Sequence, residues 1–211
     1  TTKLYHKEAG DYLQDFVGPL GVATHLEGLK KVCIVGGGVG CAIAMPIAQA
    51  LKEMGADVTS IIGFKNKDLL ILEKEMEAVA GNLYVTTDDG SYGRHGMVTA
   101  VIDELHASGK KYDLCVAIGP MIMMKFCCLT TKKYNLKTIV SMNPIMVDGT
   151  GMCGACRLVV GNEVKFACVD GPEFDGHLVD FDQAMRRQAQ YKTEEGRAML
   201  ALEEGDTHHG G

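Results

Sequence analysis

The sequence lacks a cluster of basic residues, a long apolar run and any internal repeat. Its net charge is −6, and without a basic patch nucleic acid is not an expected partner. No apolar run approaches the roughly 20 residues that a membrane-spanning helix needs, so we expect no membrane partner. What the sequence does have is 46% hydrophobic residues over a length of 211, enough for one large domain with a small appendage.

Eight cysteines are present, but no signal-peptide pattern precedes them to indicate secretion. Cys33 and Cys115 lie inside apolar runs, where cysteine is expected to behave as a small core residue. We therefore expect a reduced, cytoplasmic chain in which some of the cysteines bind metal.

Apolar runs and amphipathic stretches alternate between positions 29 and 143. This alternation is typical of an α/β fold, with a doubly wound, five-stranded parallel sheet covered by helices on both faces. The predicted strands lie within 30–40, 56–64, 82–87, 112–119 and 137–143, and the predicted helices within 42–55, 68–81, 95–109 and 120–134. On the first helix, the apolar spacing predicts a buried face made of Ile43, Ile47, Leu51 and Met54.

The composition changes along the chain and predicts several parts. We expect a nucleotide-binding α/β domain over 28–143 and a glycine- and cysteine-rich metal-binding domain over 144–182. A polar helix is predicted over 183–204, followed by a disordered tail over 205–211. Residues 1–27 look like the last hairpin of a different, antiparallel domain.

A glycine turn after the first predicted strand is the first chemical signal. Such a turn before a helix offers backbone N–H groups and about half a positive charge, which suits a pyrophosphate. The turn departs from the usual dinucleotide fingerprint, because Cys41 replaces the third glycine and no acidic residue ends the second strand. A purely structural turn is the alternative. The glycines concerned are Gly36, Gly37, Gly38 and Gly40.

Two further loops leave the same edge of the predicted sheet, where ligands of such folds bind. The loop after the third strand is polar and suits ribose and phosphate contacts, while the loop after the fourth would let a flat ring approach the backbone. The candidate residues are Asp88, Asp89 and Ser91 in the first loop and Gly119, Pro120 and Met121 in the second.

The cysteines after position 143 are spaced like metal ligands. The pattern is D-x4-C-x2-C-x11-C, made by Asp148, Cys153, Cys156 and Cys168. It keeps the spacing of plant-type [2Fe–2S] ferredoxins, with aspartate in the first place. A zinc site with three cysteines is the alternative. Other candidates for the fourth ligand are His177 and Asp170.

The sequence shows no credible pair of nucleophile and base, so we assign no catalytic residue. His95 is isolated, and the adjacent Cys127 and Cys128 lie in an apolar helix, where core packing is expected. Nicotinamides give up two electrons as hydride, whereas a [2Fe–2S] cluster takes one. A flavin is therefore expected between the two.

Taken together, these segments resemble the electron-transfer subunits of the ferredoxin reductase superfamily over nearly the whole chain. The run "GDYLQDFVGPLG" resembles the end of the family's flavin-binding β-barrel, and "VGGGVG" resembles its nucleotide turn. The family's ribose and nicotinamide loops are matched by "DDGSYGRHGMVT" and "IGPMIMMKF". Its cluster domain is matched by "NPIMVDGTGMCGACR" and "KFACVDGPEFDGHLVDF".

The resemblance implies a subunit that passes electrons between NAD(P)H, FAD and a [2Fe–2S] cluster. Its partner would be a larger flavin and iron–sulfur subunit, with ferredoxin reached through the complex. By resemblance, the cluster ligands are Asp148, Cys153, Cys156 and Cys168.

Aspartate in the first place is typical of the small subunit of NADH-dependent reduced ferredoxin:NADP oxidoreductase. The alternative branch, with cysteine there, is the electron-transfer subunit of dihydroorotate dehydrogenase in pyrimidine biosynthesis. A second alternative is a non-enzymatic nucleotide-binding module with structural zinc.

Two departures from the family pattern matter. The flavin motif Arg-x-Tyr-Ser/Thr does not occur, so we expect FAD to depend on residues upstream of Thr1 in the full-length protein. Ile118 stands where many relatives have cysteine before Gly-Pro, so no thiol is expected beside the nicotinamide.

Overall fold

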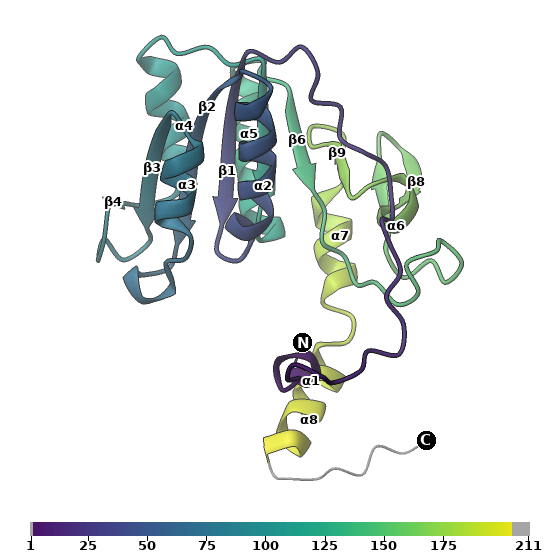
Figure 1. Cartoon of the computed structure of the whole chain (residues 1–211). Helices are drawn as coiled ribbons and strands as arrows, with labels where there is room; N and C mark the ends of the chain where they lie inside the picture. Colours follow the sequence, from purple (N-terminus) through teal and green to yellow (C-terminus); the bar gives the residue numbers. More distant parts are fainter. Residues whose placement is uncertain (1, 204–211) are drawn as a thin grey trace.

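The computed structural model describes residues 2–203, and its centre is a seven-stranded sheet in the order β4-β3-β2-β1-β5-β6-β9 (Figure 1). All neighbouring strands are parallel except β6 and β9. The predicted α/β class is confirmed, but the sheet has two edge strands, β4 and β9, beyond the five predicted. The strands are β1 (Lys31–Gly37), β2 (Asp57–Phe64), β3 (Asn82–Thr87), β4 (Arg94–His95), β5 (Leu114–Ile118), β6 (Thr138–Ser141) and β9 (Glu173–Asp175).

Four helices cover the two faces of the sheet, with α2 and α3 on one face and α4 and α5 on the other. Alternate residues of each strand point to opposite faces, so β1 sends Val32 and Ile34 toward α2 but Cys33 and Val35 toward α4 and α5. These helices are α2 (Gly40–Glu53), α3 (Glu73–Val79), α4 (Val98–Ala107) and α5 (Met121–Lys133), and a 3-10 turn, η1 (Lys67–Leu69), precedes α3.

The buried face of α2 differs from the predicted one. Ile43 and Met54 are half exposed, and the fully buried side chains are small, apart from that of Leu51. The prediction counted the largest apolar residues, whereas this helix packs close to the sheet through short side chains. The buried side chains of α2 are Cys41, Ala44, Ala48 and Leu51.

The cysteine-rich segment forms a small unit that is joined to the main sheet. A hairpin of β7 (Arg157–Val160) and β8 (Glu163–Phe166) turns at two residues with positive φ, as tight hairpin turns require. The short helix α6 (Ala167–Asp170) follows, and β9 then pairs antiparallel with β6. The segment is therefore anchored to the edge of the α/β domain.

The C-terminal region contains two helices where we predicted one over 183–204. Helix α7 (Phe181–Gln188) is capped by the Asp180 carboxylate, which accepts a hydrogen bond from a backbone N–H group, and it buries Phe181 and Ala184. Helix α8 (Lys192–Glu203) is mostly exposed, so no continuous apolar stripe ties the two helices together. The predicted tail 205–211 lies outside the described residues.

The hairpin predicted within 1–27 is wrong, because residues 6–30 contain no strand. After the short helix α1 (Thr2–Tyr5), the chain runs extended beside the cysteine-rich segment (Figure 1). The N–H group of Val22 donates to the carbonyl of Gly171 at 2.7 Å. An isolated hairpin is marginal without further strands to cover its apolar face, and here Tyr12 and Phe16 are exposed.

No helix within residues 2–203 combines the length and the apolar character needed to cross a membrane.

The start of α2 allows a test of how closely this helix approaches β5. A Cβ atom on Gly40 would lie 2.4 Å from the carbonyl oxygen of Ile118, which belongs to the backbone and cannot easily move. We expect Gly40→Ala to lower the free energy of unfolding by about 1–3 kcal/mol in chemical denaturation. Gly196→Ala in α8 is the matched control, since its Cβ would meet nothing within 4 Å. Equal stability of the two variants would contradict this packing.

Candidate functional site

A groove of about 500 Å³ opens at the carboxyl ends of β1, β2 and β3. It lies where the strand order reverses between β1 and β5, the place at which open α/β sheets bind ligands. Most of the side chains that line it are apolar, and a few polar side chains lie among them. The lining residues are Gly37, Gly38, Gly63, Phe64, Lys65, Leu69, Thr86, Asp88, Met97, Val98, Thr99, Pro120, Ile122, Met123 and Phe126.

Glycines keep this groove narrow at its base. A Cβ atom on Gly37 would lie 2.3 Å from the sulfur of Met123, and one on Gly119 would lie 3.0 Å from the Cα atom of Gly37. The next residue, Gly38, has a φ of +53°, a conformation that favours glycine. Close approach of β1 to the start of α5 therefore requires glycine at Gly37, whereas the positive φ favours glycine at Gly38.

The structure brings part of the predicted nucleotide set to the groove wall. Gly37, Gly38, Asp88 and Pro120 line it. Among the predicted residues that do not line it, Gly36 packs against Cys41 and Met121 is buried in the core. The predicted residues that lie away from the lining are Gly36, Gly40, Asp89, Ser91, Gly119 and Met121.

Asp89 and Ser91 stabilise their own loop. The hydroxyl and the N–H group of Ser91 both donate to Asp89 Oδ1, at 2.6 and 2.9 Å, and these bonds lower the pKa of Asp89. The Ser91 hydroxyl also accepts from the N–H group of Lys67. The loop is thus tied to the segment after β2, which carries Lys65 into the groove wall.

Sequence reasoning missed the apolar wall contributed by the helix starts. Met97 precedes α4, and Ile122 and Phe126 lie in the first turns of α5; all three are about half exposed or more. No signal in the sequence marked them, because an amphipathic pattern alone assigns them to no site and their exposure depends on the fold.

The loop that holds the first predicted ligands is organised by Asp148. Its Oδ1 accepts from the N–H group of Thr150 at 2.8 Å and its Oδ2 from that of Cys153 at 2.9 Å. These hydrogen bonds lower the pKa of the Asp148 carboxyl, which is otherwise exposed. Positive φ values at Gly149, Gly151 and Gly154 let the loop turn this tightly.

The three predicted cysteine ligands lie in different environments. The sulfurs of Cys156 and Cys168 are buried and 3.3 Å apart, whereas Cys153 is exposed and its sulfur accepts from the N–H group of Ala155 at 3.4 Å. Three thiols, a carboxylate and an N–H group directed at sulfur form a donor set that fits an iron–sulfur cluster.

Within residues 2–203, no three His, Cys, Asp or Glu side chains lie close enough together to hold a single metal ion.

The two other candidates for the fourth ligand have protein partners. His177 Nε2 lies 3.1 Å from the hydroxyl oxygen of Thr131 in α5, and Asp170 Oδ2 accepts from the N–H group of Phe166 at 2.7 Å. Asp148 is the candidate that shares a loop with Cys153, because it bonds directly to the N–H group of that residue.

The remaining five cysteines are buried in the α/β domain, as predicted for Cys33, Cys115, Cys127 and Cys128; Cys41 is buried with them. Burial raises the pKa of Cys41 to about 12 and also raises that of Cys127. Cys33 and Cys115 face each other on adjacent strands.

Comparison with known proteins gives consistent matches. The iron–sulfur cluster binding domain of dihydroorotate dehydrogenase B matches residues 143–180. An uncharacterized protein of Clostridium beijerinckii is 57% identical, covering 100% of this chain and 74% of its own length. The dihydroorotate dehydrogenase B (NAD(+)) electron transfer subunit homolog of Thermotoga maritima is 50% identical over 92% of this chain and 68% of its own length.

A solved structure resembles the whole described fold. It is a chain from the structure of NADH-dependent reduced ferredoxin-NADP oxidoreductase, reported for flavin-based electron bifurcation. The two chains are 47% identical and superpose with a TM-score of 0.88, over 95% of this chain and 72% of the other.

The thiols allow a direct test of these environments. In cluster-free protein at pH 8, we expect iodoacetamide to alkylate the exposed Cys153 first. Cys41, with its pKa raised to about 12 by burial, is then a thiolate in only about one molecule in ten thousand and should stay unmodified. Peptide mass spectrometry over time measures the order, and denatured protein, in which every thiol reacts, is the control. Modification of Cys41 as fast as Cys153 would refute the burial described for α2.

Proposed function

The chain belongs to the family of dihydroorotate dehydrogenase B electron transfer subunits and their homologues, and on this basis we propose that it passes electrons between NAD(P)H and a partner subunit. The proposal includes FAD and a [2Fe–2S] cluster as its electron carriers. When bound, FAD accepts a hydride and releases electrons singly, and the cluster carries one electron at a time.

The observation that carries the proposal is a wall shared by two hollows. Pro120 and Ile122 line the groove at the carboxyl end of the sheet and also a second hollow of about 550 Å³. The lining of the second hollow also includes Asn143, Pro144 and Ile145, which lead into the Asp148 loop. This shared wall supports a nucleotide in the groove close to the cysteine-rich segment, at the start of α5.

The groove has the features that a nicotinamide nucleotide needs. We assign the pyrophosphate to the glycine turn before α2, where Gly37 and Gly38 line the groove, and a ribose hydroxyl to Asp88 in the same wall. Phe126 and Met123 offer flat and polarisable surface to a ring. We favour NADH over NADPH, an inference that rests on the resemblance of Asp148 to the aspartate-type branch.

At the proposed cluster site, the chain supplies four ligands, buries two of them away from water and leaves one edge of the site exposed. Asp148 is held in place by two N–H groups, and Cys156 and Cys168 are buried away from water. The opposite edge is open, since Cys153 and its neighbour Met152 are exposed, the latter by 89%. We propose that the larger flavin and iron–sulfur subunit docks on this edge.

The partner distinguishes the two branches of the family. Asp148 supports a ferredoxin:NADP oxidoreductase type of complex, in which ferredoxin is reached through the partner. A dihydroorotate-oxidising complex is the alternative, and the electron acceptor that supports NADH oxidation in the purified complex separates the two. The zinc-module alternative is separated from this proposal by the iron and zinc content of the purified protein.

The ligand set can be tested by single substitutions. Cys153→Ser, Cys156→Ser and Cys168→Ser should each lose most of the iron and acid-labile sulfide, because a thiolate ligand is removed. Asp148→Cys should retain the cluster with altered absorption and potential, since a softer and more covalent ligand replaces a hard one. Asp148→Ala should give a labile cluster.

His177→Ala is the control for these variants, because the ring of His177 contacts Thr131 rather than the Asp148 loop. It should keep its iron content and the electron paramagnetic resonance spectrum of the reduced protein. If His177→Ala loses the cluster while Asp148→Ala leaves spectrum and lifetime unchanged, histidine is the fourth ligand and the assignment of Asp148 is wrong.

Nucleotide choice is tested by titrating NADH and NADPH and following the fluorescence of the reduced nicotinamide. We expect NADH to bind about tenfold more tightly, a difference of about 1.4 kcal/mol. Lys65→Glu should change NADH affinity only slightly, because NADH carries no 2′-phosphate for Lys65 on the groove wall to pair with. Tighter NADPH binding that is lost in Lys65→Glu would show that Lys65 recognises a 2′-phosphate and that our choice is wrong.

A further inference from the structure

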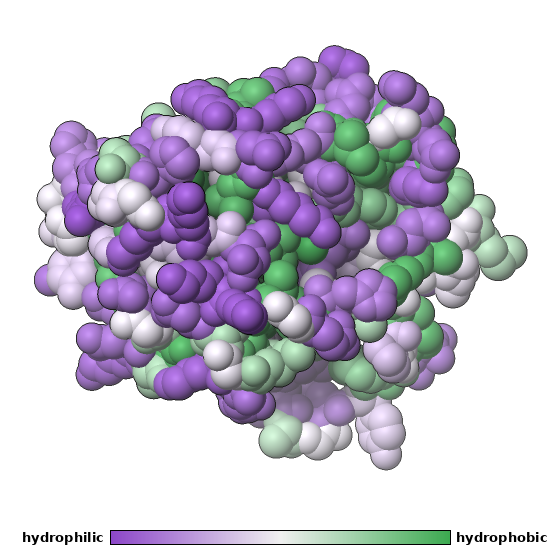
Figure 2. Space-filling model, turned by 90° about the horizontal axis from the view of Figure 1, so that it is seen from above, coloured by the Kyte–Doolittle hydropathy of each residue, from purple (hydrophilic) through white to green (hydrophobic). Residues whose placement is uncertain are grey.

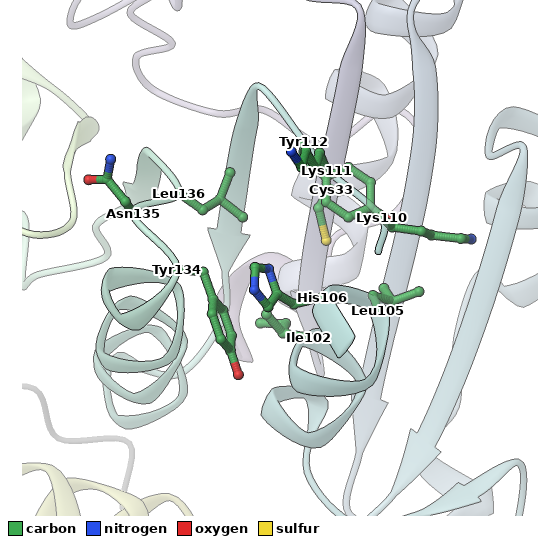
Figure 3. A pocket seen from close by; sticks show the side chains of 10 residues that line it. All are labelled: Cys33, Ile102, Leu105, His106, Lys110, Lys111, Tyr112, Tyr134, Asn135 and Leu136. Carbon is green, nitrogen blue, oxygen red and sulfur yellow. The ribbon is translucent and has the colours of Figure 1, made fainter. Parts of the chain in front are cut away.

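A third, smaller cavity lies at the other end of the sheet from the groove, where the strands begin. It measures about 190 Å³ and lies between the C-terminal ends of α4 and α5 (Figure 3). The proposed electron-transfer function uses none of its residues. They are Cys33, Ile102, Leu105, His106, Lys110, Lys111, Tyr112, Tyr134, Asn135 and Leu136.

A pair of stacked rings forms one wall of this cavity. His106 of α4 and Tyr134 after α5 lie with ring centroids 3.7 Å apart and an angle of 16° between the planes. The Tyr134 hydroxyl donates to the carboxylate of Asp103, which fixes the pair across the two helices. Opposite these rings the cavity is apolar, with Leu136 and the sulfur of Cys33 visible in Figure 3.

The charged side chains that line the cavity are all positive. Lys110 and Lys111 line the cavity, and no acidic side chain does so within residues 2–203. Of the carboxylates near the lining, Asp103 accepts from Tyr134 and Asp113 accepts from the N–H groups at the start of β1.

The two lysines differ in whether their ammonium groups contact other protein groups. Lys110 Nζ lies 3.3 Å from the Tyr84 hydroxyl and points away from the cavity in Figure 3. Lys111 has no ion-pair partner in the described part of the chain, so it is the cation available to a ligand.

One neutral hydrogen-bonding group adds to this lining. The Tyr112 hydroxyl is buried beside Thr59 and has no hydrogen-bond partner of good geometry among the described residues. Burial raises the pKa of Tyr112 to about 12, so the group stays a neutral O–H donor at physiological pH.

The size of the cavity limits the ligand to one ring. An engineered apolar cavity of about 150 Å³ binds benzene, so 190 Å³ accommodates a single ring with a small substituent. We propose that this cavity is a second ligand site, which takes a monocyclic aromatic carboxylate with its ring against His106 and Tyr134 and its carboxylate toward Lys111. Figure 2 views the molecule from this edge, where the surface is mostly hydrophilic with apolar areas between the polar side chains.

The experiment is calorimetric titration of the 211-residue chain, purified without oxygen, with benzoate as the probe. We expect one saturable site. Benzamide, which has the same shape without the charge, should bind at least about tenfold more weakly. Lys111→Glu should weaken benzoate binding by a similar factor, and Leu136→Phe, which puts a ring into the cavity, should abolish it.

Two matched variants locate the binding. Lys74→Glu makes the same charge change on the exposed surface of α3 and should leave benzoate affinity unchanged. Lys65→Glu makes it on the wall of the other groove. Thermal unfolding of each variant confirms that it is folded, which is expected for Lys111→Glu because Lys111 is exposed.

The proposal is wrong if benzoate shows no saturable binding, or if Lys111→Glu and Leu136→Phe both leave the affinity unchanged. It is also wrong if Lys65→Glu removes the binding while Lys111→Glu does not, because benzoate then occupies the groove at the carboxyl end of the sheet. None of these outcomes depends on nucleotide or cluster, so the proposed electron-transfer function is tested separately.

Discussion

The close approach of two backbones, at Gly37 and Gly119, is the constraint on which the groove depends. The strand order reverses between β1 and β5, so the helices that follow these strands lie on opposite faces of the sheet. Because neither glycine carries a side chain, Met123 reaches the end of β1 and forms one wall of the groove. A methyl group on Gly37 would overlap the Met123 sulfur. A third glycine, Gly40, likewise allows close contact, because the first residue of α2 packs directly on the backbone carbonyl of Ile118.

The cysteine-rich segment is fixed to the helix that starts at this groove. Strand β9 extends the main sheet beside β6, and His177, which follows it, contacts Thr131 in α5. Thr131 in turn accepts a hydrogen bond from Thr138 at the start of β6, and Lys125 of α5 pairs with Asp182 of α7. These bonds join α5 to the segment at several points. The groove and the cysteine-rich segment are therefore joined through one helix, α5.

Much of the fold could be predicted because its signals are local. The strands of the parallel sheet are apolar runs, and the apolar residues at helical spacing in α4, Val98, Val101, Ile102 and Leu105, are all buried. The face of α2 was misjudged because periodicity favours large side chains, whereas contact with the sheet selected Cys41, Ala44 and Ala48. The break between α7 and α8 was missed because a polar helix gives no periodic signal once its apolar contacts end.

The sequence by itself determined the class of fold, the glycine turn and the ligand spacing, since each of these depends on residues close together in the chain. Asp148 is an example, because its bonds to Thr150 and Cys153 lie within five residues. Only the tertiary structure decided which residues line the groove, because Lys65, Met97 and Phe126 come from three separate crossovers and meet only when the sheet forms. It also decided that β9 joins the main sheet, since pairing with β6 depends on long-range hydrogen bonds that no local pattern encodes. The cavity beside His106 and Tyr134 arises in the same way, from the ends of two helices that packing on one sheet face brings into contact.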